Sequence, residues 1–274
     1  MTSVTTSDGR LEPFVAPHAR TGGLGTVLAF AGLSLGLAAA ATLGGVPPAL
    51  VPFVMAIGPM FLALGLAWRE GGGAVRRLLA SAVRTPNRRA WYALVALPIA
   101  WALTVVAVAL VLGDPAVGAF DKVFPAILII PLIVLIPAFA EEIAWRGYAV
   151  ERLAPIATPL GAALILGIPW AAMHLFLQLP GQMNAGLDWW PTMLSLLGYS
   201  VILTWAYLGS GGSVLLVGLI HAGLNGVAPL MGGLIVDRTW VIRALVVAAI
   251  AAVIVLRGGL GLGVARIRSD QGAG

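Results

Sequence analysis

Long apolar runs, separated by short polar segments, occupy most of the chain between residues 24 and 256. Each run comes close to the roughly 20 residues with which a helix crosses a hydrocarbon core of about 30 Å. Proline and glycine inside the runs are tolerated in lipid where neighbouring groups satisfy the freed backbone. The pattern predicts eight transmembrane helices, at residues 24–43, 49–68, 90–112, 123–140, 160–179, 191–208, 213–231 and 241–256. We therefore expect an all-α, polytopic membrane bundle.

Polar segments at both ends of the chain set the limits of this domain. Residues 1–22 have no periodic apolar face and predict a disordered cytoplasmic tail, and residues 257–274 predict a second cytoplasmic tail. The transmembrane helical domain then extends over residues 23–256. The alanine-rich end of the first run resembles a signal-peptidase site, but the run is long for a signal peptide, so we expect a retained span.

The composition agrees with a membrane protein and excludes several other classes. The 274 residues are 60% hydrophobic and 10% charged, whereas soluble domains carry about 25% charged residues. The absence of cysteine excludes disulfide bonds and thiolate metal sites. The net charge of +5 does not indicate nucleic-acid binding, because no aromatic and basic binding face accompanies it.

Lysine and arginine are distributed unequally between the polar segments. If the N-terminus is cytoplasmic, thirteen of the 16 fall in segments on that side, six of them in residues 69–89. The positive-inside rule then predicts that both termini are cytoplasmic. Because the Ala-, Gly- and Arg-rich composition is typical of high-GC bacteria, we expect a multi-pass protein in a bacterial inner membrane, with the lipid bilayer as a partner.

Two adjacent carboxylates stand at the predicted cytoplasmic end of the fourth apolar run, in the segment Glu141-Glu142-Ile-Ala-Trp-Arg146. Glu142 and Arg146 are four residues apart, so they share one helix face and can form an ion pair. Glu141 points about a quarter turn away and stays free for chemistry. An ionised carboxylate near hydrocarbon costs a few kcal/mol, and such residues usually mark a function. A solvated helix cap is the plainer alternative.

Two histidines lie inside later apolar runs. His174 follows Trp170 by one helical turn in the fifth run, and His221 precedes Asn225 by one turn in the seventh. Taken alone, each of these side chains could serve packing or interhelical hydrogen bonding. Together with the glutamates, they make up nearly all the strongly polar groups of the membrane interior. We therefore expect them to converge on one site.

The depths of these groups must agree for such a site to form. At 1.5 Å per residue, His174 lies about 20 Å from the inner end of its helix, which is deeper than Glu141. The mismatch is removed if the fourth helix continues past Arg146 to about Glu151. We expect that continuation, together with a water-filled cavity that opens to the cytoplasm.

Three motifs follow one another on successive runs: EExxxR, an aromatic residue four positions before a histidine, and HxxxN. This pattern resembles the CPBP intramembrane proteases, which include the type II CAAX prenyl endopeptidases, the Ras-converting enzymes and bacteriocin-processing or immunity proteins. Trp170 stands where phenylalanine is commoner in the family. The resemblance covers about residues 123–230, the expected protease core. The residues that carry it are Glu141, Glu142, Arg146, Trp170, His174, His221 and Asn225.

The resemblance implies an intramembrane endopeptidase acting on a membrane-associated peptide or protein, of which prenylated C-terminal peptides are the best-known example. Peptide hydrolysis needs an activated water, a stabilised oxyanion and an acid for the leaving amine. We expect Glu141 with His174 to activate the water, and His221 with Asn225 to donate to the oxyanion. Glu142, held by its ion pair, would orient the site or share in proton transfer.

A metal-dependent reaction is the rival chemistry, since the family is often called a metalloprotease family. Glu141, His174 and His221 could hold a zinc ion, with a water in the fourth position. The chain has no HExxH motif, however, so these residues permit zinc without requiring it. We favour the glutamate-based reaction.

Two other classes of function stay open at this point. Buried glutamate, histidine and asparagine also build proton or ion pathways in transporters, although here the polar groups gather around one point and do not span the membrane. A catalytically idle member of the family could instead bind and scaffold a partner.

Overall fold

The computed structural model describes residues 23–113, 130–230 and 237–264, and every regular element among them is a helix. The predicted all-α class is therefore confirmed. The predicted tail at residues 1–22 and the first part of the fourth predicted span, residues 123–129, lie outside the described residues.

The helices follow the predicted apolar runs to within a few residues. In chain order they are α1 (Leu24–Leu43), α2 (Val51–Glu70), α3 (Ala74–Ser81), the 3-10 helix η1 (Arg89–Ala96), α4 (Leu97–Val111), α5 (Ile130–Glu142), the π-helix η4 (Ile143–Val150), α6 (Glu151–Leu153), α7 (Pro159–Leu175), the 3-10 turn η5 (Phe176–Gln178), α8 (Trp189–Gly209), α9 (Val214–Leu230), α10 (Asp237–Gly258) and the 3-10 turn η7 (Gly259–Gly261).

Within the described residues, six helical segments are long and apolar enough to cross a membrane: Leu24–Leu43, Val51–Glu70, Arg89–Val108, Pro159–Gln178, Trp189–Gly209 and Trp240–Gly261. The chain is thus a multi-pass helical bundle. The described part of α5 has 13 residues and α9 has 17, so the number of eight spans stays a prediction.

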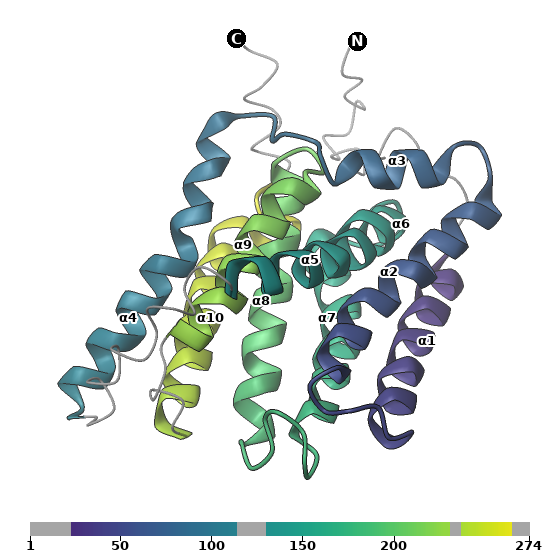
Figure 1. The fold of residues 1–274 in the computed structure, drawn as a ribbon. Coiled ribbons are helices and arrows are strands. Elements are labelled where there is room, and N and C mark those ends of the chain that lie inside the picture. The colour runs from purple at the N-terminus through teal and green to yellow at the C-terminus, as the bar shows by residue number, and fades with distance from the viewer. Residues whose placement is uncertain (1–22, 114–129, 231–236, 265–274) are drawn as a thin grey trace.

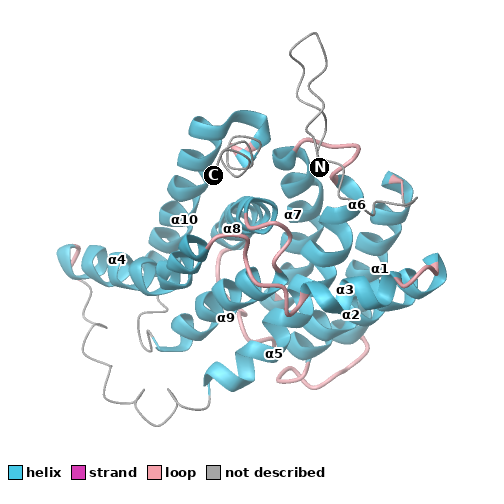
Figure 2. Cartoon of the chain, turned by 90° about the horizontal axis from the view of Figure 1, so that it is seen from above, coloured by secondary structure: helices cyan, strands magenta, loops and turns pink. Residues whose placement is uncertain are grey.

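Helix α8 is the most buried of these long helices. Over an apolar stretch of 18 residues, 78% of α8 is buried, against 22% to 44% for the corresponding stretches of the other five segments. It packs against α7 and α10 and lies near the centre of the molecule seen from above (Figure 2). The contact with α7 is close because a Cβ at Gly167 would lie 2.9 Å from Cβ of Ser200, whose hydroxyl donates to the Ala163 carbonyl over 2.7 Å. Trp170 and His174 follow Gly167 on α7.

A second close contact joins α5 to α9. A Cβ at Gly218 would lie 2.9 Å from ring atoms of Phe139, so the missing side chain is what allows this approach. The two helices are direct neighbours (Figure 2). The approach puts His221 of α9 within reach of Glu142 at the end of α5.

Helical conformation continues beyond α5 through η4 and α6 to Leu153. The predicted continuation to about Glu151 is confirmed, although the segment is a π-helix between Ile143 and Val150 and not an α-helix. All eight residues of η4 are buried. π-helical turns inside α-helices are rare and are frequent at functional sites.

The two ends of the bundle differ in character (Figure 1). We call one end the basic end: it carries α3 and the described residues Arg69, Arg76, Arg77, Arg84, Arg88, Arg89, Arg152 and Arg257. The opposite end, the loop end, consists of residues 44–50 between α1 and α2 and residues 179–188 between η5 and α8. Helix α3 lies across the basic end, where it packs on α2 and η4 (Figure 1).

Candidate active site

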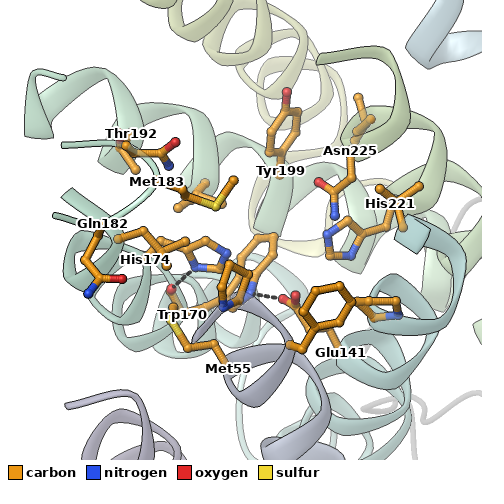
Figure 3. A pocket seen from close by; sticks show the side chains of 18 of the residues that line it. Met55, Glu141, Trp170, His174, Gln182, Met183, Thr192, Tyr199, His221 and Asn225 are labelled. Atoms are coloured by element: carbon orange, nitrogen blue, oxygen red, sulfur yellow. Dashed lines mark hydrogen bonds between the residues drawn. The ribbon is translucent and has the colours of Figure 1, made fainter. Parts of the chain in front are cut away.

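A cavity of about 730 Å³ lies between α2, α5, α7, α8, α9 and α10. Apolar side chains form most of its wall, including Phe53, Val134, Leu196 and Leu224. Glu141 is the one carboxylate among the lining residues, and the indole of Trp170 lies beside it (Figure 3).

Four of the six predicted site residues line this cavity: Glu141, His174, His221 and Asn225. They come from α5, α7 and α9, so the predicted convergence of three helices is confirmed. Asn225 lies one turn beyond His221 and is more exposed. Glu142 and Arg146 are not in the lining but lie behind it, buried in the protein.

The cavity opens toward the loop end. Residues 48–49 and 181–184 of the loops contribute to its wall, and α2, α7 and α10 line it with the parts nearest these loops. The basic segment 69–89 contributes no residue to this wall, and the prediction that the cavity opens to the cytoplasm is not tested by this geometry. The position of His174 in the sequence predicts how far this residue lies from the end of its helix. It does not predict at which end of the bundle the packed helices form a cavity. The side of the membrane that each end faces stays a prediction.

Glu142 holds two site residues together. Its side chain is 0% exposed, and its Oε1 accepts a hydrogen bond from Nη1 of Arg146 over 2.9 Å. The same oxygen lies 2.7 Å from Nδ1 of His221. The predicted Glu142–Arg146 ion pair is thus confirmed. The imidazole of His221, which we expect to stabilise the oxyanion, contacts the same carboxylate. Buried charges of this kind need such partners, because desolvation of an isolated ion is expensive.

Trp170 connects the remaining groups. Its indole Nε1 donates to Oε2 of Glu141 over 2.6 Å (Figure 3), and its backbone carbonyl lies 2.8 Å from Nδ1 of His174. The guanidinium carbon of Arg146 lies 4.7 Å from the ring centroid, a cation–π contact. The sequence placed this ring in the second motif, but its role as a donor to Glu141 was not predicted.

These contacts determine which atoms face the cavity. A carbonyl only accepts hydrogen bonds, so Nδ1 of His174 carries the proton and its Nε2 is free. An ionised Glu142 also only accepts, so Nδ1 of His221 carries a proton as well. Both imidazoles therefore keep Nε2 for a ligand. Glu141 keeps Oε1, since the indole uses the other oxygen.

The zinc arrangement considered from the sequence does not fit this geometry. Among the described residues, no three His, Asp or Glu side chains come together so that they could hold a metal ion. The Trp170 ring separates the imidazoles, with centroids 5.4 Å from His174 and 5.6 Å from His221, and both contacts are edge-on. In this structure Glu141, His174 and His221 are therefore not arranged as a set of zinc ligands.

Several polar residues of the cavity were missed by the sequence motifs. Gln178 Nε2 donates to Oγ1 of Thr192 over 2.6 Å, and Nε1 of Trp240 donates to the same hydroxyl over 3.2 Å. Thr192, Trp240 and Arg243 line the cavity from α8 and α10. An arginine inside a membrane-spanning run was the one signal that could have indicated this wall.

Comparison with known proteins gives a match to one family. Residues 123–227 match the family described as type II CAAX prenyl endopeptidase Rce1-like. This segment contains all six predicted site residues and the helices α5, α7, α8 and most of α9. No curated protein matches the chain. Over residues 123–227 the chain is therefore similar to the type II CAAX prenyl endopeptidases, and the match supports the family assignment expected from the sequence motifs.

Proposed function

We propose that the protein is an intramembrane endopeptidase that hydrolyses a peptide bond with a water activated by Glu141. The observation that supports this most directly is the position of that carboxylate: it lines an apolar cavity, one oxygen is held by Trp170, and two imidazoles lie beside the same ring. A protease that uses a glutamate as its general base within the membrane has to bring water and this carboxylate together in such a place.

In the proposed reaction Glu141 takes a proton from the water through its free oxygen. His174 orients the same water through the lone pair on Nε2, because its Nδ1–H donates a hydrogen bond to the Trp170 carbonyl. General-base catalysis of this type contributes typically 10²–10⁴-fold. The protonated Glu141 then returns the proton to the leaving amine.

The oxyanion of the tetrahedral intermediate would be stabilised by Nε2–H of a protonated His221 and by the side-chain amide of Asn225, one turn along α9. Glu142 supports the imidazolium through its contact with Nδ1 over 2.7 Å. Arg146 in turn pairs with Glu142 over 2.9 Å and holds its carboxylate in place. These two buried residues are positioning residues, because neither lines the cavity.

The substrate is a peptide or protein associated with the membrane. The largely apolar wall of the cavity favours an apolar segment or a lipid-modified residue, of which a prenylated C-terminal peptide is one form. Six helices contribute to the wall, so a substrate is surrounded by protein while its scissile bond lies at Glu141.

The test compares new peptide termini in membranes from cells that produce the wild-type protein or its Glu141→Gln variant. Mass spectrometry of protein termini should detect cleavage products with the wild type and lose them with Glu141→Gln at equal protein level. Glu151→Gln is the matched control, because Glu151 lies in the same helical segment, outside the cavity, and its amide can still accept from Tyr207. Unchanged termini in Glu141→Gln would refute the proposal.

A further inference from the structure

The short helix α3 lies across the basic end of the bundle (Figure 1). Ala74, Leu78 and Ser81 form its buried face. This face lies close against η4, since a Cβ at Gly147 would be 3.0 Å from Cδ1 of Leu78 and 3.2 Å from Oγ of Ser81. One side of α3 is thus occupied by packing, and the opposite side points away from the bundle.

The outward side of α3 carries basic and apolar side chains together. Arg76, Leu79 and Val83 follow the i, i+3, i+7 spacing of one helix face, which extends into the turn after Ser81. The exposed fraction is 47% for Leu79 and 75% for Val83. Exposed apolar side chains next to arginines on one face are typical of helices that lie in a membrane interface.

Most of the positive charge around α3 has no counter-charge in the protein. Residues 69–89 contain six arginines and a single carboxylate, Glu70, which is already paired with Arg152. The side chains of Arg69 and Arg76 form no hydrogen bond or ion pair with any described residue. The surface therefore fits an anionic partner.

Two exposed aromatic residues indicate the level at which α3 lies. Trp68 stands near the end of α2 and Tyr92 in η1, so they flank the basic segment on both sides. Tryptophan and tyrosine are enriched at the membrane–water interface. Gly71 to Gly73 all have positive φ, and this turn lets α3 leave the direction of α2 directly after Glu70. The segment thus stays at the level of the lipid headgroups.

We propose that α3 binds the headgroups of anionic phospholipids in the leaflet next to the basic end. Leu79 and Val83 enter the boundary between headgroups and acyl chains. Arg76 pairs with the phosphate, whose oxygens match the donors of a guanidinium. Each arginine near an anionic membrane surface strengthens the association about fivefold. The inference concerns a surface outside the cavity and does not depend on the protease function.

The test uses the full-length protein with a nitrobenzoxadiazole dye on Ala80→Cys, an exposed position of α3 in a chain without other cysteines. The labelled protein is placed in nanodiscs in which phosphatidylglycerol replaces phosphatidylcholine in steps. The dye emission should shift to the blue as phosphatidylglycerol increases, because α3 enters a less polar environment. Salt at 1 M should reduce the shift, because it shortens the screening length to about 3 Å.

Variants then separate the two kinds of contact. Arg76→Gln should raise the fraction of phosphatidylglycerol that gives half of the shift about fivefold, and Arg76→Lys should raise it much less. Leu79→Ser should reduce the size of the shift. Arg257→Gln is the matched control, because it removes one exposed arginine at the same end of the bundle from α10, and it should leave the midpoint unchanged.

An emission that does not depend on phosphatidylglycerol, or a response that survives both Arg76→Gln and Leu79→Ser, would overturn the proposal. An equal loss of response in Arg257→Gln would show that only the overall charge matters and would overturn it too. Soluble polyglutamate that shifts the emission as strongly in pure phosphatidylcholine nanodiscs would assign the surface to an acidic protein partner instead of a lipid.

Discussion

At the scale of single residues, the site depends on one indole. Trp170 donates to Glu141, offers its carbonyl to His174, and stacks on Arg146. Hydrogen bonds to a charged group contribute about 1.5–3 kcal/mol. The indole N–H therefore fixes which oxygen of Glu141 is left for water, which a phenylalanine in this position could not do.

Trp170→Phe tests this role. It keeps an aromatic ring but removes the donor, so the rate of peptide hydrolysis should fall by about 10- to 100-fold, which corresponds to the loss of one charge-assisted hydrogen bond. The unfolding temperature should fall as well, because the same hydrogen bond stabilises the folded protein, so the rates are compared well below the unfolding temperature of the variant. Trp205→Phe is the control, since Trp205 packs edge-on against Trp91 at a centroid distance of 5.1 Å, outside the cavity. Equal effects of the two substitutions on hydrolysis would contradict a specific role of the indole.

Residue types and spacing were enough to predict four side chains that line the cavity, namely Glu141, His174, His221 and Asn225, but not how the polar groups pair. The i, i+4 spacing of Glu142 and Arg146 is local, so their ion pair could be predicted. The partner of His221 depends on the approach of α5 and α9 at Gly218, which no local pattern encodes. The position of Arg243 in the cavity wall could not be predicted either, because it requires α10 to pack beside α8.

At the scale of elements, the segment that follows Glu141 and Glu142 is anchored at the basic end. Arg152 Nε donates to Oε1 of Glu70 over 2.8 Å, and the Arg152 guanidinium carbon lies 3.4 Å from the ring centroid of Tyr148. The Tyr148 hydroxyl donates to Glu70 over 3.2 Å. These contacts tie η4 and α6 to the end of α2. They hold the π-helix η4 in place. The hydropathy pattern gives no indication of a π-helix in this segment.

Tyr148 gives this anchor a pH dependence. Burial raises the pKa of its hydroxyl to about 12, whereas an unfolded tyrosine loses its proton near pH 10. Between these values the unfolded state binds fewer protons than the folded state, so the free energy of unfolding falls as pH rises. The unfolding temperature should drop from pH 10 to pH 12, and Tyr148→Phe should remove part of this drop. The same slope in both proteins would contradict the assignment.

At the scale of the whole molecule, the loops that line the cavity and the basic end lie at opposite ends of the bundle. The positive-inside rule, applied to thirteen of the 16 basic residues, predicts that the basic end is cytoplasmic. The loop end would then face the far side of the membrane, and the side to which the active site opens stays a prediction.

Single cysteines test this orientation cleanly, because the chain has none. In intact cells, a membrane-impermeant maleimide should label Ala185→Cys in the loop end, and it should label Arg76→Cys in α3 only after permeabilisation. Both positions are exposed in the structure. The reverse labelling pattern would show that the cavity opens to the cytoplasm.

The central claim is that three helices present one catalytic unit around one water. The most direct measurement is the hydrolysis rate of an identified substrate by purified wild-type protein and by Glu141→Gln, His174→Gln and His221→Gln, singly and in pairs. Residues that act as a unit are non-additive, so each single variant should lose at least about 10²-fold and the pairs should lose little more. Any folded single variant that retains nearly the wild-type rate, or pairs whose losses multiply, would contradict the account.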